Sequence, residues 1–289
     1  MASVADYYHL AKPERTFTNW ITAVAGFLLA SQWIFDWSLF AGLLGGIGLV
    51  IASASVVNNY TDRGLDARMS RTKKRALVTD RIKPQAALIY ALILGVIGFA
   101  LLIIWVNWLV VLLGAIAYID YVVLYGWSKR HTPWSTMIGT ICGSLSLVAG
   151  YCAVTGHIDK VAWLLFLVMF CWQMVHFYAI AIYRRDDYKA AGLPVWSVVY
   201  GQDSTHRQVQ GFILLYCVSV GLLAPYIDLV PTAILVLLSL YWLKTVFSGY
   251  SNTAAVIWGK RVFGVSLVVV LGLSLAIALG GIFPSFAAK

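Results

Sequence analysis

Long apolar runs recur along the whole chain, and they constrain its fold more than any other feature. Nine of them approach the length of about 20 residues that an α-helix needs to cross a bilayer. The chain is 61% hydrophobic and only 11% charged, against about 45–50% and about 25% in soluble globular proteins. These values exclude a soluble enzyme, a disordered chain and a disulfide-rich secreted domain. We expect an all-α polytopic membrane protein with nine transmembrane helices, at residues 17–34, 38–57, 86–105, 107–125, 134–154, 161–182, 211–228, 231–248 and 262–282.

The basic residues lie almost entirely on one side of this arrangement. Of the 21 lysines and arginines, only Lys160 and Lys289 fall on the other side. The positive-inside rule makes the richer side cytoplasmic. It places the N-terminus in the cytoplasm and the C-terminus on the opposite side of the cell inner (plasma) membrane. The net charge of +9 therefore reflects topology and an anionic substrate in a protein embedded in the lipid bilayer, with no nucleic-acid partner.

The two longest connections, residues 58–85 and 183–210, are both cytoplasmic in this arrangement and both polar. Unusually long connections tend to carry function. The first opens with Asn58, Asp62 and Asp66, which recur every four residues. On a helical extension of the preceding span they form one stripe about 12 Å long, and Mg²⁺ binds such carboxylate oxygens while it bridges to phosphate. The alternative is a solvated helix end whose acids pair with neighbouring arginines.

Basic residues accompany both acidic segments. Arg71 and Arg75 lie one helical turn apart after the first segment, where they can hold a diphosphate between metal and cations. A topology signal or a lipid-headgroup contact is the other interpretation of this basic run. The second segment, residues 183–194, again combines acid with base. Two such segments facing one cavity suit the metal-assisted ionisation of an allylic diphosphate, because metal and cations stabilise the departing diphosphate and an apolar chamber shelters the carbocation.

A histidine and an aspartate lie well inside expected spans, where ionisable residues are rare and usually face the interior of the bundle. His176 lies three residues after Gln173 in the sixth expected span. It can ligate haem iron, contact a haem propionate, or serve only as a hydrogen-bonded packing residue. Asp120, in the fourth expected span, is costly in lipid unless it is paired, and we expect a structural partner for it.

Sequence motifs spread over nearly the whole chain resemble those of the UbiA-type intramembrane prenyltransferases. The motifs are Lys12-Pro13-Glu14-Arg15-Thr16, the Asn-x3-Asp-x3-Asp segment from Asn58 to Asp66, Tyr121-x3-Tyr125 leading to Lys129-Arg130, and Asp187-Tyr188 followed by Ala191-Gly192 and Pro194. The most specific motif is Trp172-Gln173-Met174-Val175-His176-Phe177, which is similar to the haem-modifying branch of the family.

The resemblance implies a single domain over residues 1–289, folded as nine spans around a central cavity. It implies that Mg²⁺ helps farnesyl diphosphate to lose its diphosphate, and that the farnesyl group is transferred to a vinyl group of haem b with addition of water. The product is haem O for terminal oxidases, so haem-delivery or oxidase-assembly proteins are further implied partners. The residues it assigns are Asn58, Asp62, Asp66 and Asp187 to the metal and catalysis, Arg63, Arg71, Arg75, Lys129, Arg130 and Arg184 to the diphosphate, and Trp172, Gln173 and His176 to haem.

The chain also departs from the family pattern at several prolines. Val175, Ser146-Leu147, Ser197 and Ala76 stand where the family usually has proline. Proline removes a helical hydrogen bond and kinks the helix, so these changes bear on the acceptor pocket more than on the diphosphate site. Two other functions stay open: a prenyltransferase with an aromatic or quinone-precursor acceptor, and a non-catalytic polytopic protein that binds haem or transports a solute.

Overall fold

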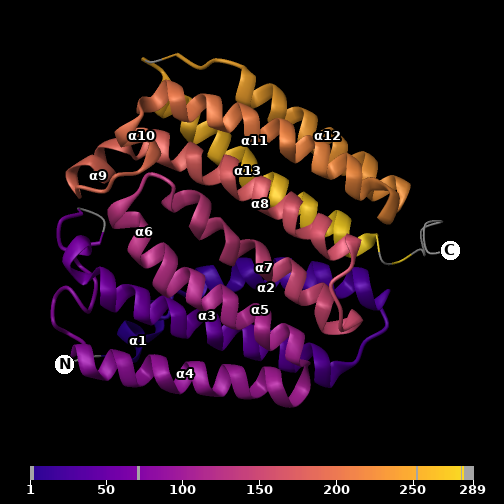
Figure 1. Ribbon diagram of the computed structural model, residues 1–289, viewed down its shortest axis with the longest axis horizontal. Helices are drawn as coiled ribbons and strands as arrows, with labels where there is room; N and C mark the ends of the chain where they lie inside the picture. Colours follow the sequence, from indigo (N-terminus) through magenta and orange to yellow (C-terminus); the bar gives the residue numbers. More distant parts are fainter. Residues whose placement is uncertain (1–2, 70–71, 252, 281, 283–289) are drawn as a thin grey trace.

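The computed structural model describes residues 3–69, 72–251, 253–280 and 282. Every regular element in these residues is helical, which confirms the predicted all-α fold. Figure 1 shows the long helices packed side by side in one bundle. They are α2 (Pro13–Ser31), α3 (Trp37–Asp66), α4 (Pro84–Trp105), α5 (Trp108–Ile119), α7 (Ser135–Thr155), α8 (Lys160–Tyr183), α11 (Gly201–Leu223), α12 (Leu229–Phe247) and α13 (Ala255–Leu279).

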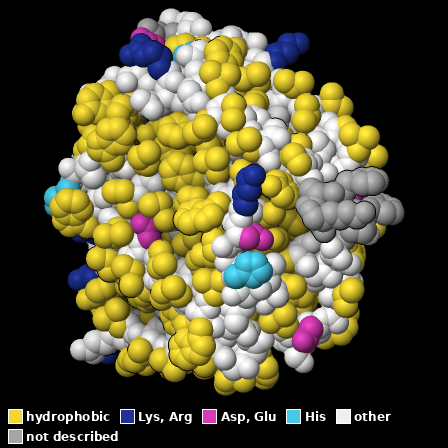
Figure 2. Space-filling model, turned by 45° about the vertical axis from the view of Figure 1, so that its right-hand side comes forward, with side chains coloured by type: hydrophobic (Ala, Val, Ile, Leu, Met, Phe, Trp, Pro, Cys, Tyr) yellow, Lys and Arg dark blue, Asp and Glu magenta, His cyan; other side chains and the backbone are white. Residues whose placement is uncertain are grey.

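Eight helical stretches of the described chain are long and apolar enough to cross a membrane. They match the second to ninth expected spans, and α5 reaches this length by continuing through a π-helical turn (Asp120–Leu124) into α6 (Tyr125–His131). The first expected span corresponds to α2, which carries Glu14 and Arg15 near its start and is not among the eight. The count of nine therefore stays a prediction. Hydrophobic side chains cover much of the surface seen in Figure 2, and charged ones are few there, as in a multi-pass membrane protein.

Three helices extend further toward polar sequence than the expected spans do. The extension of α3 to Asp66 makes the acidic stripe helical, as predicted. The expected starts at 211 and 262 were wrong, because α11 begins at Gly201 and α13 at Ala255. Polar residues are accommodated there by contacts between helix ends: Gln202 donates a hydrogen bond to the carbonyl of Ile182 at 3.3 Å. The second connection is therefore shorter than the sequence predicted. It contains α9 (Arg185–Ala190) and α10 (Trp196–Val199).

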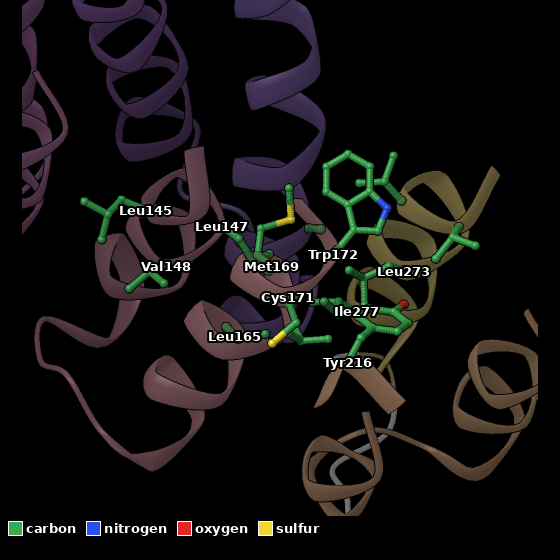
Figure 3. Close-up of a cluster of buried hydrophobic side chains, with 14 of the residues drawn as sticks. Leu145, Leu147, Val148, Leu165, Met169, Cys171, Trp172, Tyr216, Leu273 and Ile277 are labelled. Atoms are coloured by element: carbon green, nitrogen blue, oxygen red, sulfur yellow. The ribbon is translucent and has the colours of Figure 1, made fainter. Parts of the chain in front are cut away.

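A large apolar core lies where α7, α8, α11 and α13 meet. Figure 3 shows side chains from all four helices in this cluster, among them Leu147, Met169, Tyr216 and Ile277, which are all buried. Trp172 belongs to the same cluster, and its indole N–H donates to the carbonyl of Ser266 at 2.9 Å. A buried polar atom is therefore satisfied inside an apolar environment.

Glycines allow α2 to lie directly against α7. A Cβ atom on Gly150 would stand 1.9 Å from the carbonyl oxygen of Ala23, and one on Gly26 would stand 2.1 Å from that of Leu147. Small residues at such crossings are typical of helix packing in membranes. The close crossing holds α2 firmly in the bundle, although α2 is too polar to count among the eight spanning stretches.

Asp120 is buried at the start of the π-helical turn that joins α5 to α6. Its Oδ2 accepts a hydrogen bond at 3.2 Å from the backbone N–H of Cys142 on α7. The structural partner that we expected for Asp120 is therefore a backbone group. Single π turns often occur at functional sites, and this one contains Tyr121 and is followed directly by Tyr125.

Candidate active site

A cavity of about 500 Å³ lies between α2, α3, α5, α7 and α8. Much of its wall is apolar and includes Ile47, Val50 and Leu113, whereas Arg15 and Lys129 line its charged end. This volume is in the range of ligand-binding cavities. An apolar chamber with a cationic end suits a molecule that has a hydrocarbon chain and an anionic head.

The acidic residues of α3 lie at this charged end, and each is paired with a cation. Asp62 Oδ2 lies 2.5 Å from Lys129 Nζ, and its Oδ1 lies 3.2 Å from Arg130 Nη2. One turn further along, Asp66 Oδ2 lies 2.6 Å from Arg75 Nη1. The two carboxylates are only 13% and 6% exposed. This burial argues against the solvated helix end that was the alternative interpretation of the stripe.

Asn58 continues the stripe toward the interior. Its Oδ1 accepts hydrogen bonds from the Tyr121 hydroxyl at 3.2 Å and from Lys12 Nζ at 3.4 Å. Lys12 is buried, and its φ of 52° is in the left-handed region that non-glycine residues rarely adopt. Burial lowers the pKa of the Lys12 ammonium well below its usual range, because the charged form loses hydration. Strain and a desolvated amine at one position indicate a site shaped for function. The sequence alone predicted no role for Lys12 at the site, although it lies in a family motif.

Two tyrosines that sequence reasoning did not assign to the site line the cavity. The rings of Tyr121 and Tyr125 are stacked with their centroids 5.8 Å apart. Arg15 donates a hydrogen bond to the Tyr121 hydroxyl, and Lys129 Nζ lies 5.1 Å from the ring centre of Tyr125. The only signal for these residues was their four-residue spacing within the family motif. Their π faces can stabilise a cation in the cavity.

The second acidic segment packs against the first. Leu193 and Val195 belong to a small apolar cluster with Leu65 and Met69, which flank Asp66 in sequence, and Tyr188 lines the cavity. The two polar connections therefore meet at one end of the bundle. Figure 1 shows α6, α9 and α10 at this same end.

Asp187 itself stands apart from the stripe. It is exposed on α9, and the described residues contain no group of three acidic, histidine or cysteine side chains that could by itself hold a metal. The donor set of α3 nevertheless fits Mg²⁺ in its chemistry, because this ion takes carboxylate and amide oxygens and completes its shell with waters and substrate phosphates. Asn58, Asp62 and Asp66 are the residues that could hold the ion, with the diphosphate supplying further oxygens.

Only some of the predicted diphosphate ligands contact the acidic stripe in the structure. Arg63 is turned back on its own helix: its guanidinium lies 4.6 Å from the Tyr60 ring centre and donates to the Tyr60 carbonyl at 3.0 Å. Arg184 hydrogen-bonds the hydroxyl of the adjacent Tyr183 at 3.3 Å. Arg71 lies outside the described residues. The residues that the structure does join to the acidic stripe are Arg75, Lys129 and Arg130.

The three residues predicted to bind haem all line the cavity from α8. The rings of Trp172 and His176 stack with their centroids 4.8 Å apart. His176 Nδ1 lies 2.7 Å from the hydroxyl of Ser266, and Gln173 donates to the hydroxyl of Ser144 at 3.3 Å. These contacts hold an aromatic surface and an imidazole at the wall of the cavity. Lys129, the ion-pair partner of Asp62, lines the same cavity.

One departure from the family's proline pattern changes the cavity wall. The hydroxyl of Ser146 donates to Asn19 Oδ1 at 2.5 Å, and both residues line the cavity. Ser197 is not one of the lining residues, and its hydroxyl donates to the carbonyl of Ala181 at 2.6 Å. Only position 146 thus gives the chamber a polar group that proline cannot supply.

Comparison with known proteins identifies the family. The family model described as "UbiA prenyltransferase family" matches residues 19–266. A "Protoheme IX farnesyltransferase 2" of Chromobacterium violaceum is 41% identical over 284 residues, which cover 96% of this chain and 93% of the relative. A "Protoheme IX farnesyltransferase" of Yersinia enterocolitica is 40% identical over 290 residues, which cover 98% and 97%. The chain therefore belongs to the UbiA prenyltransferase family, and it is a prenyltransferase.

Solved structures share the fold at lower sequence identity. A UbiA homologue from Aeropyrum pernix K1 superimposes with a TM-score of 0.72 at 19% identity, covering 91% of this chain and 97% of its own. A UbiA homologue from Archaeoglobus fulgidus bound to GPP and Mg²⁺ gives a TM-score of 0.69 at 15% identity, covering 92% and 99%. Both have the architecture described above, and the second holds a prenyl diphosphate with a divalent metal.

Proposed function

We propose that this protein transfers the farnesyl group of farnesyl diphosphate to a vinyl group of haem b, with addition of water, to give haem O. One observation carries the proposal: two nearly buried, ion-paired carboxylates, Asp62 and Asp66, stand at the charged end of an apolar cavity whose wall also carries Trp172 and His176. The names of relatives about 40% identical over nearly the full length support the choice of substrates.

The cationic residues of the site bind the diphosphate and stabilise its departure. Lys129, Arg130 and Arg75 lie around the stripe, where they can exchange part of their contact with the carboxylates for contact with phosphate oxygens. Asn58, Asp62 and Asp66 would hold Mg²⁺, with Asp187 of the second acidic segment as the further proposed ligand. When bound, the ion neutralises charge that develops on the leaving diphosphate. Positioned charges of this kind are the main means of catalysis in such reactions.

The residues of the cavity wall shelter the farnesyl cation from water and bind the acceptor. Ile47, Val50 and Leu113 keep bulk water away from the hydrocarbon chain. Tyr121 and Tyr125 present their π faces to positive charge. Trp172, Gln173 and His176 bind the porphyrin from α8. The vinyl carbon of haem b attacks the farnesyl cation, and water then captures the new cation on the porphyrin substituent.

The side of the membrane on which the active site lies follows from the positions of its basic residues. The basic connections that carry Arg75, Lys129 and Arg184 lie at the end of the bundle where the two polar segments meet. We assign this end to the cytoplasmic side of the inner membrane, with the N-terminus inside and the C-terminus outside, by the positive-inside rule. Haem-delivery and oxidase-assembly proteins are the partners that would supply haem b and receive haem O.

A product assay tests the proposal. Purified protein incubated with Mg²⁺, haem b and farnesyl diphosphate should yield a more hydrophobic haem whose mass exceeds that of haem b by one farnesyl group and one hydroxyl group. Asp62→Ala and Asp66→Ala should each abolish the product while the protein keeps its helix content. Folded wild-type protein that farnesylates an aromatic acid and ignores haem b, or that makes no product at all, would contradict the proposal.

A further inference from the structure

Two buried polar atoms one helical turn apart on α3 have no hydrogen-bond partner among the described residues. They are Ser55 Oγ and Asn58 Nδ2, on side chains that are 1% and 4% exposed. Leaving a buried donor unpaired costs free energy, and nearly all such groups in native proteins find a partner. Residues three apart on a helix lie on the same face. The two donors therefore form one local feature.

The hydroxyl of Ser55 differs from those of Ser144 and Ser239, two other buried serines in the bundle. Ser144 and Ser239 each donate to a carbonyl one turn earlier in their own helix, at 2.7 Å in both cases. This back-bonding is the usual way for a membrane helix to satisfy a serine. Ser55 makes no such bond, and it lines the central cavity. Ser55 is therefore a residue of the cavity wall whose hydroxyl has no protein partner among the described residues.

The chemistry of the two atoms selects an acceptor as their ligand. The carbonyl oxygen of Asn58 accepts hydrogen bonds from Tyr121 and Lys12, whereas its unpaired amide nitrogen can only donate. The Ser55 hydroxyl can donate beside it. The pair lies between the ion-paired carboxylate of Asp62 and the apolar wall formed by Val50 and its neighbours. A prenyl diphosphate bound across this boundary has one oxygen at the junction of its head and its chain.

We propose that Ser55 and Asn58 donate hydrogen bonds to the ester oxygen that joins the diphosphate to C1 of the prenyl chain. This assignment rests on the proposed function and extends it to the bond that breaks. When the C1–O bond ionises, both bonding electrons stay on this oxygen, and no proton is transferred. The two hydrogen bonds strengthen as its negative charge grows. Ser55 is thereby a catalytic residue for the leaving group.

Three single variants give the first test. Ser55→Ala should lower kcat about 100-fold, the lower end of the effect of removing one donor to a developing oxyanion, with the KM for farnesyl diphosphate raised no more than about fivefold. Ser55→Thr keeps a hydroxyl and should retain most of the wild-type rate. Ser53→Ala is the matched control on the same helix: Ser53 is buried, but its hydroxyl already bonds the carbonyl of Ala91 at 2.7 Å, and its loss should leave kcat unchanged.

Binding without turnover separates a contact to this oxygen from a structural role. Farnesyl diphosphate and an analogue with a CH₂ group in place of the ester oxygen would be titrated by tryptophan fluorescence, without acceptor. Ser55→Ala should weaken binding of the oxygen-bridged ligand about fivefold, the value of one net hydrogen bond, and leave the affinity for the CH₂ analogue within twofold. Equal weakening of both ligands, or of neither, overturns the inference. Failure of wild-type protein to farnesylate haem b would instead refute the proposed acceptor and leave this binding difference intact.

Discussion

The ammonium of Lys129 lies 2.5 Å from a carboxylate oxygen of Asp62, and the two side chains are only 8% and 13% exposed. The pair links α6 to α3 at the charged end of the cavity, across 67 positions of sequence. The desolvation of such a pair can cost more than its Coulombic attraction returns. Its presence is therefore better explained by the proposed diphosphate site than by stability.

Replacement of Lys129 by methionine separates a role in stability from a role in the diphosphate site. Lys129→Met leaves the Asp62 carboxylate with Arg130 as its cation, so we expect a loss of up to about 3 kcal/mol in the free energy of unfolding and at least a 100-fold loss in haem O formation. Thermal unfolding in detergent and the product assay measure the two effects. The double variant Lys129→Met/Asp62→Leu should regain stability without activity. A double variant that regained both would show that the pair is only structural.

The two adjacent acids of α9 provide a matched pair for the second segment. Asp186 and Asp187 are both exposed at the start of this short helix, so neither contributes much to packing. Asp187→Asn should lower turnover more than tenfold and raise the Mg²⁺ concentration needed for half-maximal rate, because a metal-binding oxygen loses its charge. Asp186→Asn should change neither quantity. Equal effects of the two substitutions would contradict the role of Asp187.

The proposed haem-binding role of His176 can be tested without the prenyl donor. His176 lies on the cavity wall against Ser266 and Trp172. His176→Ala should weaken haem b binding at least tenfold in a titration of the Soret band, and should leave the affinity for farnesyl diphosphate unchanged. His206→Ala is the control, since His206 stacks on Tyr250 and is not one of the residues that line this cavity. Normal haem affinity in the His176 variant would refute the assignment.

The packing of α2 on α7 gives a prediction about stability. The Cβ of Gly150→Ala would overlap the carbonyl oxygen of Ala23, whereas a Cβ at Gly264 meets nothing within 4 Å. Overpacking of this kind typically costs about 1–3 kcal/mol. Gly150→Ala should therefore lower the unfolding temperature in detergent, and Gly264→Ala should not. An unchanged unfolding temperature in the Gly150 variant would mean that the two helices can move apart freely.

The errors of the sequence interpretation lie where helices meet. Hydropathy placed the starts of the last helices at polar-to-apolar transitions, but α11 begins ten residues earlier, at Gly201, because contacts such as that of Gln202 with the carbonyl of Ile182 satisfy its polar first turns. The sequence placed Lys12 and Arg15 in a family motif but gave neither a role at the site. Their proximity to Asn58 and Tyr121 depends on how α2 packs, which no local pattern contains.

The sequence by itself determined the helical membrane fold and the stripe of Asn58, Asp62 and Asp66, because hydropathy and the helical period are properties of neighbouring residues. It also placed Trp172, Gln173 and His176 on one span. Only the tertiary structure decided which cations meet the acids, that Arg63 is turned away, and that Ser55 is left without a partner at the cavity. Such contacts join residues far apart in the chain, and they follow from the packing of whole helices against one another.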